Sequence, residues 1–234
     1  MTSLILKSLI SKSTVMAVTL TLVSSASNAD IGAIDMAANT MDLQQLKVLS
    51  EQSVDYEHAY AQYRTAITAN ISGLRGVAKK ALNEAQTTLE TVLSREDDAE
   101  SMALLASVYG MQIANDSSKG QSLGMKVSAL LAQAEQLSPE NPRIALVRAM
   151  SAFYTPAQYG GGMDKAEQYA TDAIRFYELP CVDICWGHTE AYTWRGIAKQ
   201  ELGRQQEAIN DWQHAVEIDP NYAWANFLLK QQAR

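Results

Sequence analysis

Apolar and small residues recur at helical spacing along almost the whole chain after about residue 41, and short polar, glycine or proline segments interrupt them. A period near 3.6 residues predicts amphipathic helices, and the sequence shows no sustained alternation of the kind expected for strands. All five prolines fall between the periodic segments, where they are expected to mark helix boundaries: Pro139, Pro142, Pro156, Pro180 and Pro220. The pattern therefore predicts an all-α protein built from consecutive short helices.

The clearest pair of predicted helices lies in residues 189–222. A tight turn at Gly203 separates the two helices, and Asp219 and Pro220 are expected to end the second one. Small residues stand where the helices must approach closely, and one large side chain fills the space between them: Gly196, Ala208, Ala215 and Trp212. One helix pair cannot bury its apolar face alone, so the pattern predicts stacked neighbours.

The residues of this pair resemble the tetratricopeptide repeat, whose signature places small and large residues at fixed offsets with a period of about 34 residues. The match includes Tyr192, Gly196, Ala208, Trp212, Ala215 and Pro220, and it departs at Arg195 and Lys199, where the family prefers Leu and Tyr. More degenerate repeats are expected in residues 52–95, 99–141 and 142–180, and residues 223–234 resemble a capping helix. The resemblance implies a right-handed α-solenoid of stacked antiparallel helix pairs over residues 42–234, with a C-terminal capping helix.

The first 29 residues have a different composition, with Lys7, Lys12, an apolar run and a final Ser27-Asn28-Ala29. This layout predicts a secretory signal peptide in residues 1–29, followed by a flexible lead-in in residues 30–41. The alternative is an uncleaved membrane anchor, but the apolar run is shorter than the roughly 20 residues that span a bilayer. We therefore expect an exported protein without a membrane span after cleavage, periplasmic if its source is a Gram-negative bacterium and secreted otherwise.

Composition narrows the class of partner. The chain is 47% hydrophobic, which is ordinary for a globular protein, and its formal net charge is −7. Removal of residues 1–29 takes away two lysines and no acidic residue, so the charge becomes −9. An acidic protein without a basic run is not expected to bind nucleic acid, because phosphate binding requires lysine and arginine.

In tetratricopeptide proteins the first helices of the repeats line an inner surface that commonly binds a peptide or a partner helix. The family's inner positions correspond here to Arg143, Leu146, Met150, Glu190, Thr193 and Ile197. The alternative is that Leu146, Met150 and Ile197 face the core. A stripe of tyrosines at helical spacing, Tyr56, Tyr60 and Tyr63, likewise fits either core packing or a ligand-facing aromatic patch.

The most unusual segment is residues 181–188, an insertion relative to the repeat that contains Cys181, Cys185 and His188. An exported compartment favours a disulfide, which the four-residue spacing permits and which would contribute roughly 2 kcal/mol. Two free thiols are the second possibility. A metal site made by the three residues is the third, although it lacks a fourth ligand and the usual zinc spacing.

No catalytic residue, cofactor or metal ligand is predicted, because the three histidines, His58, His188 and His214, belong to no recognisable catalytic motif. We expect a protein–protein interaction module, an adaptor or scaffold that binds a peptide or partner helix in the inner groove. One alternative is an enzyme or accessory factor whose site is formed by the insertions in residues 159–162 and 181–188. Another alternative is a structural protein that forms homo-oligomers.

Overall fold

The computed structural model describes residues 30–181 and 184–232. These residues form helices and no strand. The α-helices are α1 (Ile31–Asn39), α2 (Leu43–Gln52), α3 (Asp55–Ile71), α4 (Arg75–Leu93), α5 (Ala99–Asn115), α6 (Gly120–Leu137), α7 (Pro142–Tyr154), α8 (Met163–Tyr177), α9 (His188–Glu201), α10 (Gln205–Ile218) and α11 (Ala223–Gln232). Two short 3-10 helices, η1 (Ser117–Lys119) and η2 (Ala157–Tyr159), lie in the connections.

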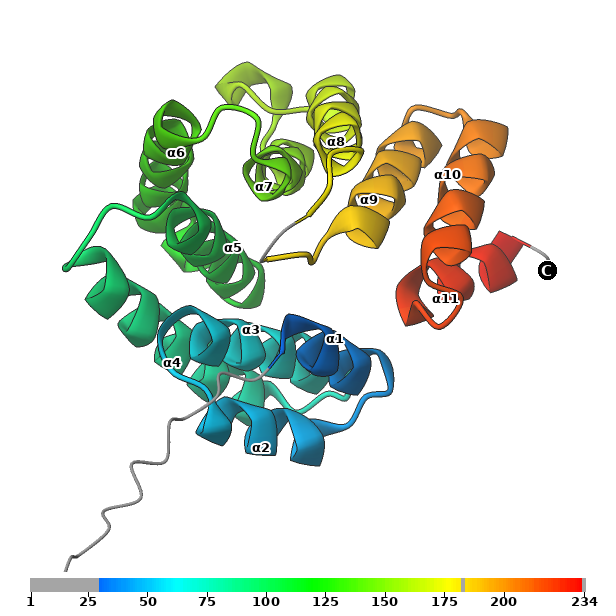
Figure 1. The fold of residues 1–234 in the computed structure, drawn as a ribbon. Coiled ribbons are helices and arrows are strands. Elements are labelled where there is room, and N and C mark those ends of the chain that lie inside the picture. Colours follow the sequence, from blue (N-terminus) through cyan, green and yellow to red (C-terminus); the bar gives the residue numbers. More distant parts are fainter. Residues whose placement is uncertain (1–29, 182–183, 233–234) are drawn as a thin grey trace, which may run out of the picture.

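Consecutive helices pack as antiparallel pairs, α3 with α4, α5 with α6, α7 with α8 and α9 with α10 (Figure 1). The four helix pairs lie in the four predicted repeat segments, except that α9 begins one residue before the last segment, at His188, and α11 follows the last pair as the capping helix. The expected all-α solenoid of stacked helix pairs is therefore confirmed. The predicted signal peptide, residues 1–29, lies outside the described residues.

Side-chain caps and proline begin several of the helices where the sequence indicates a boundary. The Asp98 carboxylate accepts a hydrogen bond from the Ser101 amide at 2.8 Å, which caps α5. Asn141 caps α7 in the same way, with Pro142 at the first helical position, where its missing N–H costs nothing. Gly203 forms the predicted turn with a φ of 79°, and α10 ends at Ile218, directly before Asp219.

The close approach predicted for the last helix pair is present. A Cβ atom added to Gly196 would lie closer than 3.0 Å to the Trp212 side chain. Trp212 is fully buried, and its indole Nε1 donates a hydrogen bond to the Thr193 carbonyl at 3.3 Å. Ala208 and Ala215 are also fully buried, so the small residues do create the space that the indole fills.

The two departures from the repeat pattern have a common explanation. Arg195 and Lys199 both reach Asp211 on the neighbouring helix, with nitrogen–oxygen distances of 2.6 and 2.9 Å. Because Asp211 is buried, its charge requires such partners. An ionic contact thus replaces the apolar contact that the family would make between these helices.

The expectation of a flexible lead-in in residues 30–41 is wrong, because this segment contains α1. Asp30 caps the helix by accepting a hydrogen bond from the Gly32 amide, and Ile34 is fully buried. The helix packs against α2 and α3. Its sequence is short and rich in small residues, so its periodicity is weak, and packing against α3 rather than intrinsic propensity stabilises it.

Candidate functional site

The inner face of the array is formed by α3, α5, α7 and α9, the first helices of the four pairs, each of which contacts the next. The tyrosine stripe lies on the first of these helices. Tyr56, Tyr60 and Tyr63 are all buried, so the core interpretation is correct. Burial raises the pKa of each phenol well above its ordinary value, which keeps the three hydroxyls protonated.

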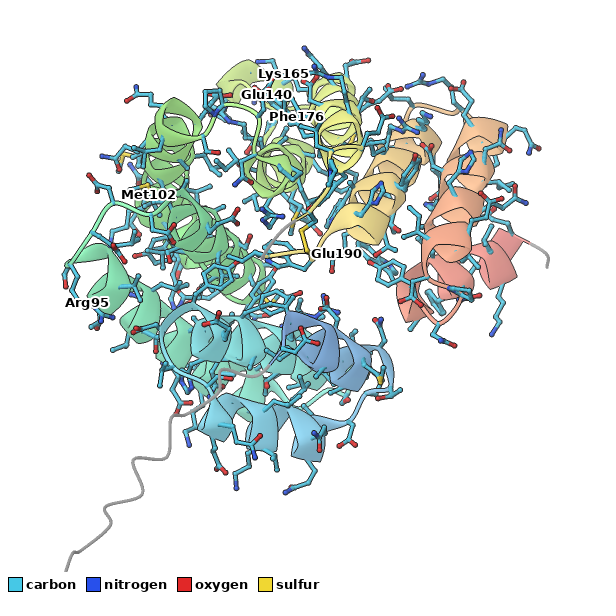
Figure 2. The ribbon with its side chains drawn as sticks, in the orientation of Figure 1. Arg95, Met102, Glu140, Lys165, Phe176 and Glu190 are labelled. Carbon is cyan, nitrogen blue, oxygen red and sulfur yellow. A yellow bond between two sulfur atoms is a disulfide. The ribbon has the colours of Figure 1, made fainter. Side chains whose placement is uncertain are left out.

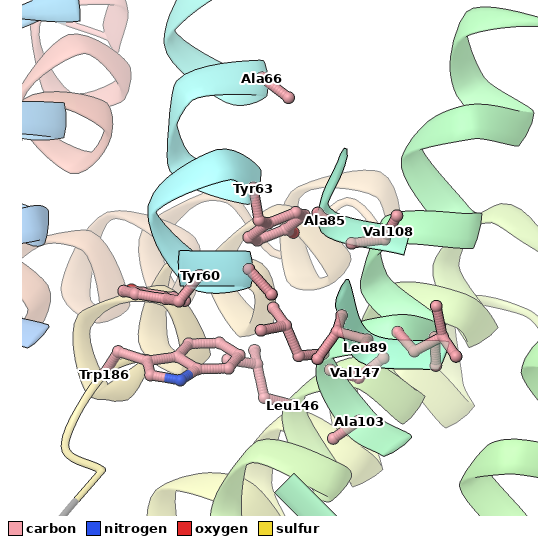
Figure 3. Close-up of a cluster of buried hydrophobic side chains, with 14 of the residues drawn as sticks. Tyr60, Tyr63, Ala66, Ala85, Leu89, Ala103, Val108, Leu146, Val147 and Trp186 are labelled. Carbon is pink, nitrogen blue, oxygen red and sulfur yellow. The ribbon is translucent and has the colours of Figure 1, made fainter. Parts of the chain in front are cut away.

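Trp186, from the insertion before α9, fills one end of this inner face. The residue is 3% exposed, and its ring stacks on Tyr60 with 5.3 Å between centroids. The indole Nε1 donates a hydrogen bond to the Tyr56 hydroxyl at 2.8 Å, a contact between residues 130 positions apart. Figure 3 shows the indole below Tyr60 and beside Leu146. The insertion therefore packs into the array.

Gly187 holds Trp186 in this position. Its φ of 102° is accessible to glycine and strained for other residues. A Cβ atom at Gly187 would meet the Tyr177 hydroxyl closer than 3.0 Å and Leu146 Cδ2 at 2.8 Å. The Tyr177 hydroxyl also donates a hydrogen bond to the Trp186 carbonyl at 2.7 Å. Only glycine fits between these groups, so the sequence Trp186-Gly187 is adapted to this one arrangement.

The same end of the inner face contains a buried ionic network. The Arg64 guanidinium on α3 lies 2.6 Å from Glu190 on α9 and 3.3 Å from Asp35 on α1. Figure 2 places Glu190 at the start of α9, on the inner side of the array. Burial raises the pKa of Glu190, and the Arg64 charge opposes that effect. Tyr60 donates a hydrogen bond to Asp35 at 2.6 Å, which ties α1 to the network.

These contacts close the array on itself. In Figure 1 the chain curves so that α9, α10 and α11 return toward α1 and α3. The Asn39 side chain at the end of α1 donates a hydrogen bond to Asp219, 180 residues away at the end of α10, at 3.2 Å. The first helix and the last helix pair are thus in direct contact, and the inner face is enclosed at the end where Trp186 lies.

The six residues predicted to line the groove fall into two groups. Four are occupied by internal contacts: Arg143 pairs with Glu100, Glu190 pairs with Arg64, and both Leu146 and Thr193 are fully buried. The remaining two, Met150 and Ile197, are partly buried and pack at the edge of the core. Of the six, only Met150 and Ile197 combine apolar character with surface that a partner could contact.

An aromatic cluster, which the sequence analysis did not identify, lies beside these two residues. Its members are Phe153, Tyr154, Trp194 and Trp224, and we call it the aromatic surface. Trp194 lies at its centre, with ring centroids 5.3, 5.8 and 5.2 Å from those of the other three. Tyr154 is 70% exposed although it belongs to this cluster.

The helical register places the aromatic surface on the predicted groove. Tyr154 follows Leu146 and Met150 at intervals of four on α7, and Trp194 stands four residues after Glu190 and three before Ile197 on α9. Residues at such spacings share one helix face. The sequence signal for this cluster was a pair of aromatic residues at the end of a predicted helix, but only the fold shows that α7, α9 and α11 bring their rings together.

The cysteine pair forms the disulfide that the spacing and compartment favoured. The Cys181 and Cys185 sulfur atoms are bonded, with 5.7 Å between the Cα atoms. The free-thiol and metal-site alternatives are therefore wrong. His188 instead stacks on Tyr177 with 5.0 Å between ring centroids, and burial lowers its pKa. Among the residues that the structure describes, no group of histidine, cysteine and acidic side chains is placed to hold a metal ion.

No protein-family model matches the sequence, and no curated protein gives a significant match. Among solved structures, the chain is similar to a thermophilic TPR protein of Thermus thermophilus, with a TM-score of 0.57 and 18% identity over 86% of this chain and 96% of that one. The fold of this chain is tetratricopeptide-like. The chain also has a TM-score of 0.49 and 22% identity to the HusA haemophore of Porphyromonas gingivalis, covering 72% of this chain and 94% of that one.

The inner face of the tetratricopeptide-like array thus has two different halves. One half is filled by Trp186 and the Arg64 network, and the other carries the aromatic surface.

None of the helices within residues 30–181 and 184–232 has the length and apolarity that a membrane crossing requires.

Proposed function

We propose that this protein is an interaction module that binds an extended peptide or a partner helix on the aromatic surface. The observation that carries the proposal is the exposure of Tyr154 at 70% within a cluster of four aromatic rings. Aromatic residues contribute most of the binding energy at many protein interfaces, and their exposure in a free protein is typical of such sites. Met150 and Ile197 supply apolar surface next to the rings.

Because half of the inner face is already occupied, we expect the partner to bind through a short segment. Trp186, Leu146 and the Arg64–Glu190 pair already make the contacts that a long ligand would make in an open groove. A partner on the remaining half is therefore expected to present one or two apolar anchor residues rather than an extended polar sequence. Its other contacts would be with the polar rim of the array.

We also propose that the protein acts outside the cytoplasm. The N-terminal 29 residues have the layout of a secretory signal, and a disulfide between Cys181 and Cys185 is stable in an oxidising compartment. The compartment is the periplasm if the source is a Gram-negative bacterium. Protein and peptide partners that reach this compartment are the ones to consider.

Selection from a displayed peptide library tests the binding proposal. Peptides enriched on the wild-type protein should carry aromatic or large aliphatic anchors, and Tyr154→Ala should weaken their binding roughly tenfold or more, as expected for a central aromatic contact. Tyr159→Ala is the matched control, because Tyr159 is 77% exposed and belongs to no aromatic pair among the described residues. Equal effects of the two substitutions would contradict the proposal.

Light scattering on the free protein tests self-association on the same surface. A monomer at the concentrations used for binding is the expected result, because the rings then remain available to a partner. A dimer that dissociates in Tyr154→Ala and persists in Tyr159→Ala would instead assign the aromatic surface to contact between two copies. That outcome would replace the peptide proposal with the self-association alternative.

A further inference from the structure

A surface cavity between α4 and the end of α5 is lined by more positively than negatively charged side chains. Its volume is about 520 Å³, within the range of small-molecule sites. Arg75, Lys79 and Lys119 contribute to its lining. The cavity is formed by the outer helix α4 and the α5–α6 connection, so it is separate from the aromatic surface on α7, α9 and α11.

The three cations form no salt bridge, and for Arg75 this differs from the other arginines that the structure describes. Of the arginines that the structure describes, Arg75 is the one without a salt bridge, and Lys79 and Lys119 also pair with no carboxylate within 4.0 Å. Asp116 is the acidic residue of the lining, and it accepts hydrogen bonds from the Ser118 amide and hydroxyl. One negative charge therefore faces three positive charges.

This arrangement opposes the stability of α4. Arg75 is the first residue of the helix, where the macrodipole disfavours a cation, and Lys79 stands four residues later, where like charges repel each other. The first turn of α4 contains no acidic residue that would offset either effect. Residues that weaken the fold in this way are expected at binding sites, where a ligand supplies the missing charge.

Neutral hydrogen-bonding groups also line the cavity. Gln112 is 6% exposed and lines the cavity, and its Nε2 donates a hydrogen bond to Gln86 at 2.9 Å. Its Oε1 accepts no hydrogen bond among the described residues and is not fully buried. Asn83 and Asn115 add two further amides. Such groups can bind the uncharged part of a ligand whose anionic part contacts the cations.

We propose that this cavity binds a small molecule that carries a phosphate monoester group. The planar guanidinium of Arg75 can contact two phosphate oxygens, while Lys79 and Lys119 each supply one further positive charge. Two net positive charges around the cavity match the charge of a phosphate monoester at neutral pH. The amides of Gln112, Asn83 and Asn115 contact the hydroxyl groups of the organic portion.

Isothermal titration calorimetry on the chain at low ionic strength tests the site with inorganic phosphate, glycerol 3-phosphate, citrate and glycerol as probes. We expect glycerol 3-phosphate to bind more tightly than inorganic phosphate, and glycerol not to bind. Arg75→Gln should weaken binding roughly tenfold or more, because it removes the charge-assisted hydrogen bonds of the guanidinium. Lys80→Gln is the matched control, because Lys80 lies on the same helix, pairs with Glu84 and does not line this cavity.

Asp116→Asn should change the affinity for phosphate in the opposite direction. Removing this carboxylate should strengthen binding of the phosphate several-fold, because it removes the repulsion between Asp116 and the ligand. The Tm of Arg75→Gln should be no lower than that of the wild type, which separates lost binding from lost folding. The proposal is overturned if neither phosphate compound binds, if only citrate binds, if Lys80→Gln has the same effect as Arg75→Gln, or if Asp116→Asn weakens binding.

Discussion

Replacing Gly187 by alanine should destabilise the protein by about 3–7 kcal/mol. The backbone contribution is about 1–3 kcal/mol, because φ is 102° at this residue. The added Cβ would overlap the Tyr177 hydroxyl and approach Leu146 Cδ2 to 2.8 Å, a close contact of the kind that costs about 1–3 kcal/mol in a packed interior. Moving Tyr177 away would also break its hydrogen bond to the Trp186 carbonyl, worth about 1 kcal/mol.

Gly203→Ala is the matched control for the backbone contribution. Gly203 has a φ of 79°, and a Cβ added there would meet no atom within 4 Å. Its substitution should therefore cost only the backbone contribution of about 1–3 kcal/mol. Urea unfolding followed by far-ultraviolet circular dichroism would measure both free energies. The difference between the two variants isolates the cost of displacing the side chains around Trp186.

A double substitution tests the assigned clash directly. Tyr177→Phe removes the hydroxyl that the new Cβ would overlap, so Gly187→Ala should cost at least about 1 kcal/mol less in the Tyr177→Phe background than in the wild type. If Gly187→Ala costs no more than Gly203→Ala, or if its cost is the same in both backgrounds, then Trp186 is not held by the packing described above.

Three further predictions concern other contacts. Gly196→Ala should destabilise the protein by about 1–3 kcal/mol, because its Cβ would meet Trp212. Gly110→Ala should instead stabilise it by about 0.5–1 kcal/mol, because Gly110 lies within a helix and its added Cβ would meet no atom within 4 Å. Thermal unfolding of both variants would check the opposite signs. Reducing the Cys181–Cys185 disulfide, or replacing both residues by serine, should lower the free energy of unfolding by about 2 kcal/mol, and thiol titration of the denatured, unreduced protein should find no free thiol. Burial raises the pKa of Glu190 above 4.5 in the folded state, so protonation of this carboxylate stabilises the fold. The free energy of unfolding of the wild type, measured relative to that of Glu190→Gln, should therefore fall as pH rises from below 4.5 through the folded pKa. A difference between the two proteins that stays constant over a pH series would contradict this prediction.

The helical pairs could be predicted from the sequence because they depend on local signals. Spacing of small residues identified the Gly196 contact, and Pro142 marked the helix boundary at which α7 begins. The α1 helix was missed because its stability comes from packing on α3, a contact that its weak periodicity does not encode. Local pattern thus determined the elements, while contacts between distant helices determined whether the weakest one forms.

The candidate site was less predictable for the same reason. The six predicted groove residues lie on α7 and α9, but the sequence could not show that Trp186 would occupy part of the face that they share. Nor could it show that Trp224, in the last helix, would meet Trp194. The position of Trp186, which contacts Tyr56 130 residues away, depends on the curvature of the array, and that curvature sums small rotations between the pairs.

The closure of the array also bears on how the chain unfolds. In an open repeat protein each unit contacts only its neighbours, so the ends can fray independently of the centre. Here the Arg64–Glu190 and Asn39–Asp219 contacts join residues 126 and 180 positions apart. Losing the last helix pair would therefore also remove support from α1, and the two ends should unfold in one cooperative transition. Contacts of such long sequence separation further imply slower folding than is usual for a helical protein of this size.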